Sequence, residues 1–302
     1  MNFIKEVVAS DDEEVFKLVL SWTAGLVTNL KSINKTALVL QSLPGTGKNT
    51  FTEFLRFVLG QHCIYEATGV GSIAQKHNSI IQGKRLIVVN ELSSTRAEFH
   101  SQFDKIKSYI TDKTVIIEPK NVNQYSIENI GNYIYMTNHK DSMVIEQGDR
   151  RYHCIEVSTK YINHWDYFGL LREKCFNQAT ADAFYTFLLD YKAEPLYKIV
   201  ETQLRKDMMQ LSKPSTLKFI DEFVDHPEEF FVNDEEYHEQ AGKELFKKSR
   251  RIQASEFFSK YVRWCKESNE KPISQTKFGL IVKEMSKIII KEGRYYKLVK
   301  TS

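Results

Sequence analysis

One loop constrains this chain more than any other stretch of its 302 residues. Residues 36–51 (TALVLQSLPGTGKNTF) place a short apolar strand before a glycine-containing turn and an amphipathic helix after it. The glycines allow backbone N–H groups to converge on an anion, the helix offers the positive end of its dipole, and a lysine adds a point charge. The loop therefore predicts a phosphate cradle formed by Pro44, Gly45, Thr46, Gly47, Lys48, Asn49 and Thr50.

The loop departs from the G-x-x-x-x-G-K-[ST] pattern at both of its ends. Ser42 stands at the first glycine position, and Asn49 follows the lysine where a hydroxyl that binds Mg²⁺ is expected. An amide oxygen also ligates Mg²⁺, but more weakly than a well-placed hydroxyl or carboxylate. We therefore expect Mg²⁺ to be held weakly or indirectly, with Asn49, Asn90 and Glu91 as the candidate residues.

Two further apolar strands end in polar residues suited to nucleotide chemistry. Residues 86–89 are followed by Asn90 and Glu91, and residues 133–137 are followed by Asn138. A carboxylate just beyond a buried strand can polarise the water that attacks a γ-phosphate, which is the role we assign to Glu91. Asn138 is assigned to the same water or to the γ-phosphate. The alternatives are a solvated carboxylate and an ordinary turn asparagine.

The alternation of strands and helices over residues 36–158 predicts an α/β fold with a mostly parallel sheet. Helices are expected over residues 3–30 and 165–211, and Trp165 and Phe168 are among the apolar residues that recur at helical spacing in the second. Residues 212–215 (SKPS) indicate a linker.

The net charge of +3 hides an asymmetry between the two ends of the chain. Residues 243–302 hold 16 Lys and Arg against 6 Asp and Glu, a net of +10, so residues 1–242 carry −7. A basic C-terminal module suggests a polyanionic partner, and a solvated lysine-rich surface is the alternative. The four scattered cysteines argue against a zinc site or disulfides, and no apolar run reaches membrane-spanning length. We expect a soluble, cytoplasmic protein.

The last fifty residues have the element order of a winged helix. A helix around residues 257–265, a turn at Pro272, a second helix and two short strands around residues 292–293 follow one another. The second helix and the hairpin would present basic side chains to DNA, with Lys277, Lys283, Lys287 and Arg294 as candidate contacts. A small protein-docking domain with ordinary surface lysines is the alternative.

Together these motifs resemble those of a superfamily 3 helicase, and more narrowly the helicase module of phage, plasmid and large-virus primase–helicases. The matching segments are GTGKNTF (45–51), GKRLIVVNEL (83–92), KSYITD (107–112), IEPK (117–120), TN (137–138) and GDRR (148–151). The resemblance implies an AAA+-like P-loop ATPase core at residues 35–160. It would be flanked by an N-terminal helical segment (1–34), a second helical segment (161–212) and a basic winged-helix-like domain (213–302).

The resemblance also implies roles for residues that spacing alone does not assign. Such helicases are hexameric rings with ATP between subunits, and an arginine from the neighbour completes each site. Arg151 matches that residue best and Arg150 is the alternative, with local pairing to Asp149 expected for one of them. A hairpin over residues 114–128 would grip single-stranded DNA, with contacts from Lys120, Asn121 and Asn123.

The sequence thus predicts an ATP- and Mg²⁺-dependent DNA helicase, 3′ to 5′ by resemblance, acting on single-stranded or forked DNA. It would serve a phage, plasmid or virus-like element in the host cytoplasm, with a primase in cis or in trans. Lys48, Glu91, Asn138 and an arginine would carry the chemistry. One alternative is a slow, nucleotide-gated origin-binding protein without strong unwinding. A small-molecule kinase is less favoured, because it needs neither the paired arginines nor the basic tail.

Overall fold

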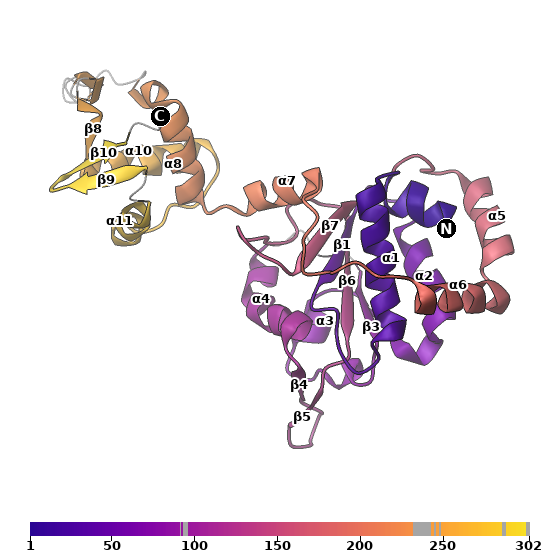
Figure 1. The fold of residues 1–302 in the computed structure, drawn as a ribbon. Coiled ribbons are helices and arrows are strands. Elements are labelled where there is room, and N and C mark those ends of the chain that lie inside the picture. Colours follow the sequence, from indigo (N-terminus) through magenta and orange to yellow (C-terminus); the bar gives the residue numbers. More distant parts are fainter. Residues whose placement is uncertain are drawn as a thin grey trace. The chain divides into compact units, whose positions relative to one another are not determined.

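The computed structural model divides the chain into two compact units, residues 1–212 and 213–302 (Figure 1). It describes residues 1–90, 92, 96–231, 243–244, 246–247, 249–285 and 288–299. Each unit has its own hydrophobic core. Within the described residues, no helix combines the length and apolar character needed to cross a membrane.

A five-stranded parallel sheet forms the centre of the first unit, which confirms the predicted α/β class. Its strands lie in the order β2 (Ile64–Ala67), β3 (Leu86–Val89), β6 (Asn132–Thr137), β1 (Ala37–Gln41) and β7 (Tyr152–Glu156). The sequence analysis did not identify β2. In this edge strand the two end residues are buried, and the more accessible Tyr65 and Glu66 lie between them. The strand therefore lacks the apolar run of its neighbours.

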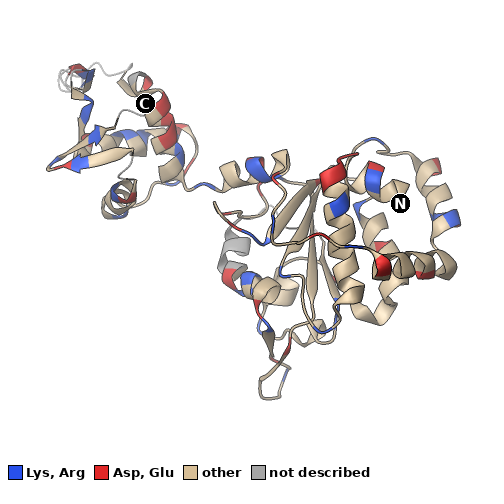
Figure 2. Ribbon diagram, in the orientation of Figure 1, with Lys and Arg blue, Asp and Glu red and all other residues tan. Residues whose placement is uncertain are grey.

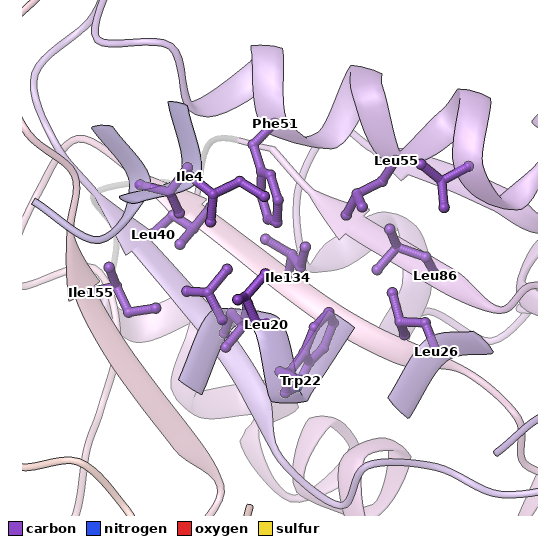
Figure 3. Close-up of a cluster of buried hydrophobic side chains, with 14 of the residues drawn as sticks. Ile4, Leu20, Trp22, Leu26, Leu40, Phe51, Leu55, Leu86, Ile134 and Ile155 are labelled. Carbon is purple, nitrogen blue, oxygen red and sulfur yellow. The ribbon is translucent and has the colours of Figure 1, made fainter. Parts of the chain in front are cut away.

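Helices cover both faces of this sheet, which explains the continuous apolar runs of its central strands. On one face Leu40 and Ile134 pack with Trp22 and Phe51 (Figure 3). The helices there are α1 (Glu13–Thr28), α2 (Lys48–Leu59) and α6 (Gln178–Asp190). The other face contacts α3 (Gly71–Ala74), α4 (Arg96–Thr111) and α7 (Gln203–Ser212).

The single helix expected over residues 3–30 is in fact two. A π-helix, η1 (Ile4–Val8), is separated from α1 by a turn in which Ser10 and Asp11 have positive φ. The Asp12 side chain accepts hydrogen bonds from the N–H groups of Glu14 and Val15, so it caps α1. The helical pattern of the sequence continues across this break, so one helix was predicted where the structure has two.

The second long helix, expected over residues 165–211, is divided into α5 (Trp165–Cys175), α6 and α7. Residues 191–202 are not helical. Pro195 has no N–H to donate, and the N–H of the preceding Glu194 donates to Ser21 Oγ at 2.9 Å, so this segment bonds to α1 instead. Short 3₁₀ segments are η2 (Gln61–Cys63) and η3 (Ser79–Ile81).

The predicted hairpin is confirmed as β4 (Thr114–Ile117) and β5 (Tyr125–Glu128), an antiparallel pair that projects from the unit (Figure 1). The fully buried Asn78 fixes the end of β4 that leads into the loop. Asn78 Nδ2 donates to the Ile116 carbonyl at 2.8 Å, and its Oδ1 accepts from the Glu118 N–H at 2.9 Å.

The second unit contains the expected helix, helix and hairpin in that order. Its elements are α8 (Ser215–Asp225), η4 (Pro227–Phe231), β8 (Arg251–Gln253), α10 (Ala254–Glu267), α11 (Gln275–Glu284), β9 (Ile289–Glu292) and β10 (Tyr295–Leu298). The antiparallel sheet has the order β8-β10-β9, so the unpredicted β8 adds a third strand to the hairpin. Rings of Phe219, Phe257, Tyr261 and Phe278 form the centre of its core.

Candidate active site

The glycine loop, residues 42–48, lies between the carboxyl end of β1 and the start of α2. Gly45 and Gly47 have φ angles of 80° and 96°, in the left-handed region that glycine favours. At Gly47 an added Cβ would also lie 2.7 Å from a ring carbon of Phe168. Backbone conformation and close packing therefore both require glycine at this position.

The Lys48 ammonium group joins this loop to the end of β6. Its Nζ donates to the Ser42 carbonyl at 2.7 Å, to Ser42 Oγ at 2.9 Å and to Asn138 Oδ1 at 2.7 Å. Because burial disfavours the charged form, the pKa of Lys48 is lowered to about 8. An anion bound in the loop would favour the ammonium form again. Two predicted residues, 90 positions apart, thus meet at one edge of the sheet.

Ser42 ties the loop together at the position where the usual pattern has glycine. Its Oγ lies 2.5 Å from Thr46 Oγ1 and also accepts from Lys48. The sequence analysis identified Ser42 only as a departure from the pattern. Its positioning role follows from a hydroxyl that faces the inside of the loop, which spacing alone does not reveal.

Asn90, Asn138 and the loop meet because the carboxyl ends of parallel strands lie along one edge of the sheet. The buried Oδ1 of Asn90 has no hydrogen-bond partner among the described residues, so a hard oxygen donor is available for Mg²⁺. Asn49 lines the same cavity. Glu91 lies outside the described residues. In the described part of the chain no cluster of three His, Cys, Asp or Glu could hold a metal.

These residues line a cavity of about 700 Å³, a size typical of small-molecule sites. The loop, α2 and the ends of β3 and β6 supply polar groups, and α5 supplies Trp165, Phe168, Gly169 and Arg172. The sequence analysis gave Trp165 only as one of the apolar residues at helical spacing. In the structure it is 77% exposed and lies at the cavity.

The paired arginines differ in their surroundings. Arg151 Nη1 lies 2.8 Å from Oδ2 of the buried Asp149, and the Arg151 N–H donates to Asp149 Oδ1 at 2.7 Å. Arg150 is exposed and has no ion pair or hydrogen bond within the described part of the chain. The local pairing expected for one of the two therefore falls on Arg151. Which arginine acts across an interface stays a prediction.

The candidate DNA contacts are exposed. Lys120, Asn121 and Asn123 lie at the tip of the β4–β5 hairpin, where Asn121 has a φ of 61°. In the second unit Lys277 and Lys283 on α11 and Arg294 at the β9–β10 turn are also exposed, whereas Lys287 lies outside the described residues. Figure 2 shows Lys and Arg on the β9–β10 hairpin and acidic residues on α8. The role of each candidate stays a prediction.

Comparison with known proteins identifies the central segment of the chain. Residues 40–151 match a family model described as a family of unknown function (DUF5906). This segment runs from β1 to Arg151 and includes Lys48, Asn90 and Asn138. The matched part is about a third of the chain, and it holds every predicted catalytic residue.

One similar curated protein is the DNA primase-polymerase of Nitratiruptor phage NrS-1, with 23% identity over 223 residues. The match covers 74% of this chain but only 31% of that protein, so the chain spans about a third of its relative's length. Among solved structures, the apo C-terminal region of NrS-1 has a TM-score of 0.72 at 17% identity, covering 98% of this chain and 74% of that one. A JCV helicase structure has a TM-score of 0.39 at 14% identity, covering 70% and 61%, which is too low to carry an argument. The NrS-1 likeness shows a shared fold.

Proposed function

We propose that this chain is the ATP-dependent helicase motor of a phage-type DNA replication protein. The observation that carries the proposal is the Lys48–Asn138 hydrogen bond of 2.7 Å, beside a loop whose glycines adopt the left-handed conformation. The cavity that they line has an ammonium group, an amide and a glycine loop that leads into a helix, which are the features that suit a polyphosphate.

In this proposal Lys48 binds the β- and γ-phosphates of ATP. Its bond to Asn138 would be exchanged for phosphate oxygens, which leaves Asn138 facing the γ-phosphate. Glu91 would orient and polarise the attacking water. Mg²⁺ would neutralise phosphate charge, with Asn90 and Asn49 as weak or indirect ligands.

Assembly as a ring, with six subunits by resemblance, would supply an arginine to each neighbouring site. Arg151 is engaged with a buried carboxylate, whereas Arg150 is exposed, so the contacts favour Arg150 as the crossing residue. This reverses the order that the sequence motif favoured. Leaving buried Asp149 without a partner would itself be costly, which is a reason for Arg151 to stay in place.

Single-stranded or forked DNA is the proposed track, with 3′ to 5′ movement by resemblance. The exposed hairpin tip would contact phosphates through Lys120 without selecting a sequence, as movement along any DNA requires. The basic face of the winged-helix-like second unit would add a further contact. The phage relative is a DNA primase-polymerase, which supports a primase partner in cis or in trans.

The test is ATP hydrolysis with and without single-stranded DNA, for the natural protein and for Glu91→Gln. A motor should show DNA-stimulated turnover that the variant loses while it still binds ATP. The neutral oxygens at residues 49 and 90 favour a second candidate, a slow nucleotide-gated origin-binding protein. Tight ATP binding with little turnover in either protein, with or without DNA, would establish that candidate instead.

A further inference from the structure

The cavity has two chemically different sets of walls. The loop, Lys48, Asn90 and Asn138 are polar and suit phosphate. Helix α5 contributes Trp165 and Phe168, whose rings cannot bind phosphate but offer flat apolar faces. A nucleoside triphosphate has the same division, since its base is a flat aromatic group attached to a charged chain.

Trp165 is the unusual member of the aromatic wall. Its exposed fraction of 77% is matched among the large exposed hydrophobic residues of the described chain only by Tyr197, at 79%. Large aromatic residues that remain exposed at a cavity are characteristic of binding sites, because stacking would bury area that folding leaves in water. Trp165 contributes nothing to the described hydrophobic clusters, so core packing does not explain it.

The helix that carries Trp165 is held firmly against the candidate phosphate site. Phe168, one turn further along α5, packs on Gly47 so closely that a Cβ there would clash. Arg172 Nη2 lies 2.5 Å from Glu53 Oε2, which joins α5 to α2. These two contacts fix the α5 backbone relative to the loop that would hold the phosphates.

We infer that Trp165 is a stacking platform for the base of the nucleotide whose phosphates occupy the glycine loop. This inference rests on the proposed ATP site and adds the residue that recognises the base. An indole ring binds the face of a base and accepts any purine or pyrimidine. Arg172, which also lines the cavity and lies over the Phe176 ring at 5.2 Å, adds a second planar group.

The test compares ATP with inorganic tripolyphosphate, which has the charges but no base. By calorimetry, Trp165→Ala should weaken ATP binding about 5- to 150-fold and leave tripolyphosphate binding unchanged. Trp165→Phe should retain most of the ATP affinity because it keeps a stacking ring. Tyr197→Ala is the matched control, since it removes an equally exposed aromatic residue that does not line this cavity.

Fluorescence gives a second readout. Of the three tryptophans, Trp22 is fully buried and Trp264 is 7% exposed, so solvent-exposed emission comes from Trp165. ATP should quench the tryptophan emission of the natural protein and leave the remaining emission of Trp165→Phe unchanged, and tripolyphosphate should change neither.

The outcomes separate this inference from the proposed function. If the natural protein binds neither ATP nor tripolyphosphate, the assignment of the glycine loop as a phosphate site is wrong, and so is the stacking role of Trp165. If it binds both and Trp165→Ala changes neither, the phosphate site stands and only the platform is overturned. Equal losses for both ligands, or an effect on self-association alone, would also overturn the platform.

Discussion

The candidate nucleotide site and the β4–β5 hairpin are both built around a lysine, and they differ in how firmly the fold holds it. Lys48 makes three hydrogen bonds of 2.9 Å or less and is buried enough for its pKa to fall to about 8. Lys120 is exposed and forms no hydrogen bond or ion pair within the described part of the chain, although Asn78 and Gln82 hold the two strands of its hairpin. A site for a small, defined ligand is preformed, whereas a contact with a long, uniform polymer needs only a charge in reach.

The largest expected effect concerns the two arginines, which differ in the same way as the two lysines: the fold holds Arg151 through a buried carboxylate and leaves Arg150 exposed. Arg150→Ala should lower ATP turnover about 10³- to 10⁵-fold with ATP binding retained, because an arginine supplied from a neighbour stabilises the transition state. Arg151→Ala should instead lower the midpoint of thermal unfolding, since it leaves buried Asp149 without its partner. Turnover, ATP binding and melting are measured for both variants.

The opposite pattern is informative. If Arg151→Ala loses more turnover than Arg150→Ala and melts normally, the original sequence assignment holds and the Asp149 pair must break during assembly. Two folded variants with normal turnover would remove the arginine step from the mechanism.

A pH experiment tests how strongly the fold constrains Lys48. ATP binding favours the ammonium form, so with a pKa near 8 the ATP affinity should fall above pH 8, by at most about tenfold per pH unit. Calorimetry from pH 7.5 to 9.5 measures this. Lys76→Met, which removes an exposed lysine outside the cavity, should leave the profile unchanged.

The lowered pKa of Lys48 should also affect how the stability of the protein changes with pH. The folded pKa of Lys48 lies below its ordinary value of 10.5, so between about pH 8 and 10.5 the unfolded chain binds more protons. The contribution of Lys48 to the free energy of unfolding should therefore rise with pH across that window. Urea melts of the natural protein and Lys48→Met isolate this contribution as a difference. A difference that does not change with pH would show that Lys48 titrates normally.

The sequence was a good guide where burial on both faces leaves a continuous apolar run. Strands β1, β3 and β6 were predicted for that reason, and their parallel order brought Lys48 and Asn138 together. Strand β2 was missed because Tyr65 and Glu66 interrupt its apolar character, and β8 was missed because it has only three residues, of which the first and last are polar. Helices were predicted too long because apolar spacing continues across the turn at Ser10 and across residues 191–202.

The aromatic wall of the cavity was missed for a different reason. A tryptophan and a phenylalanine three residues apart have the same spacing whether they face a core or a ligand. Only the position of α5 against Gly47 shows that Phe168 packs inward while Trp165 remains exposed. Spacing gives a face of a helix, and the tertiary fold decides what lies opposite it.

The smallest expected effect concerns Lys120, the exposed lysine of the hairpin. Lys120→Ala should weaken single-stranded DNA binding and reduce the salt slope by about 0.7, the contribution of one phosphate contact, while basal ATP hydrolysis survives. Lys76→Ala is the matched control, because it removes an exposed lysine that is not a candidate DNA contact, and Lys283→Ala tests the second unit separately. The slope is measured as log affinity against log salt for all three variants. If Lys283→Ala lowers the slope and Lys120→Ala does not, the second unit holds the strand, and the hairpin's exposed charge would be ordinary surface.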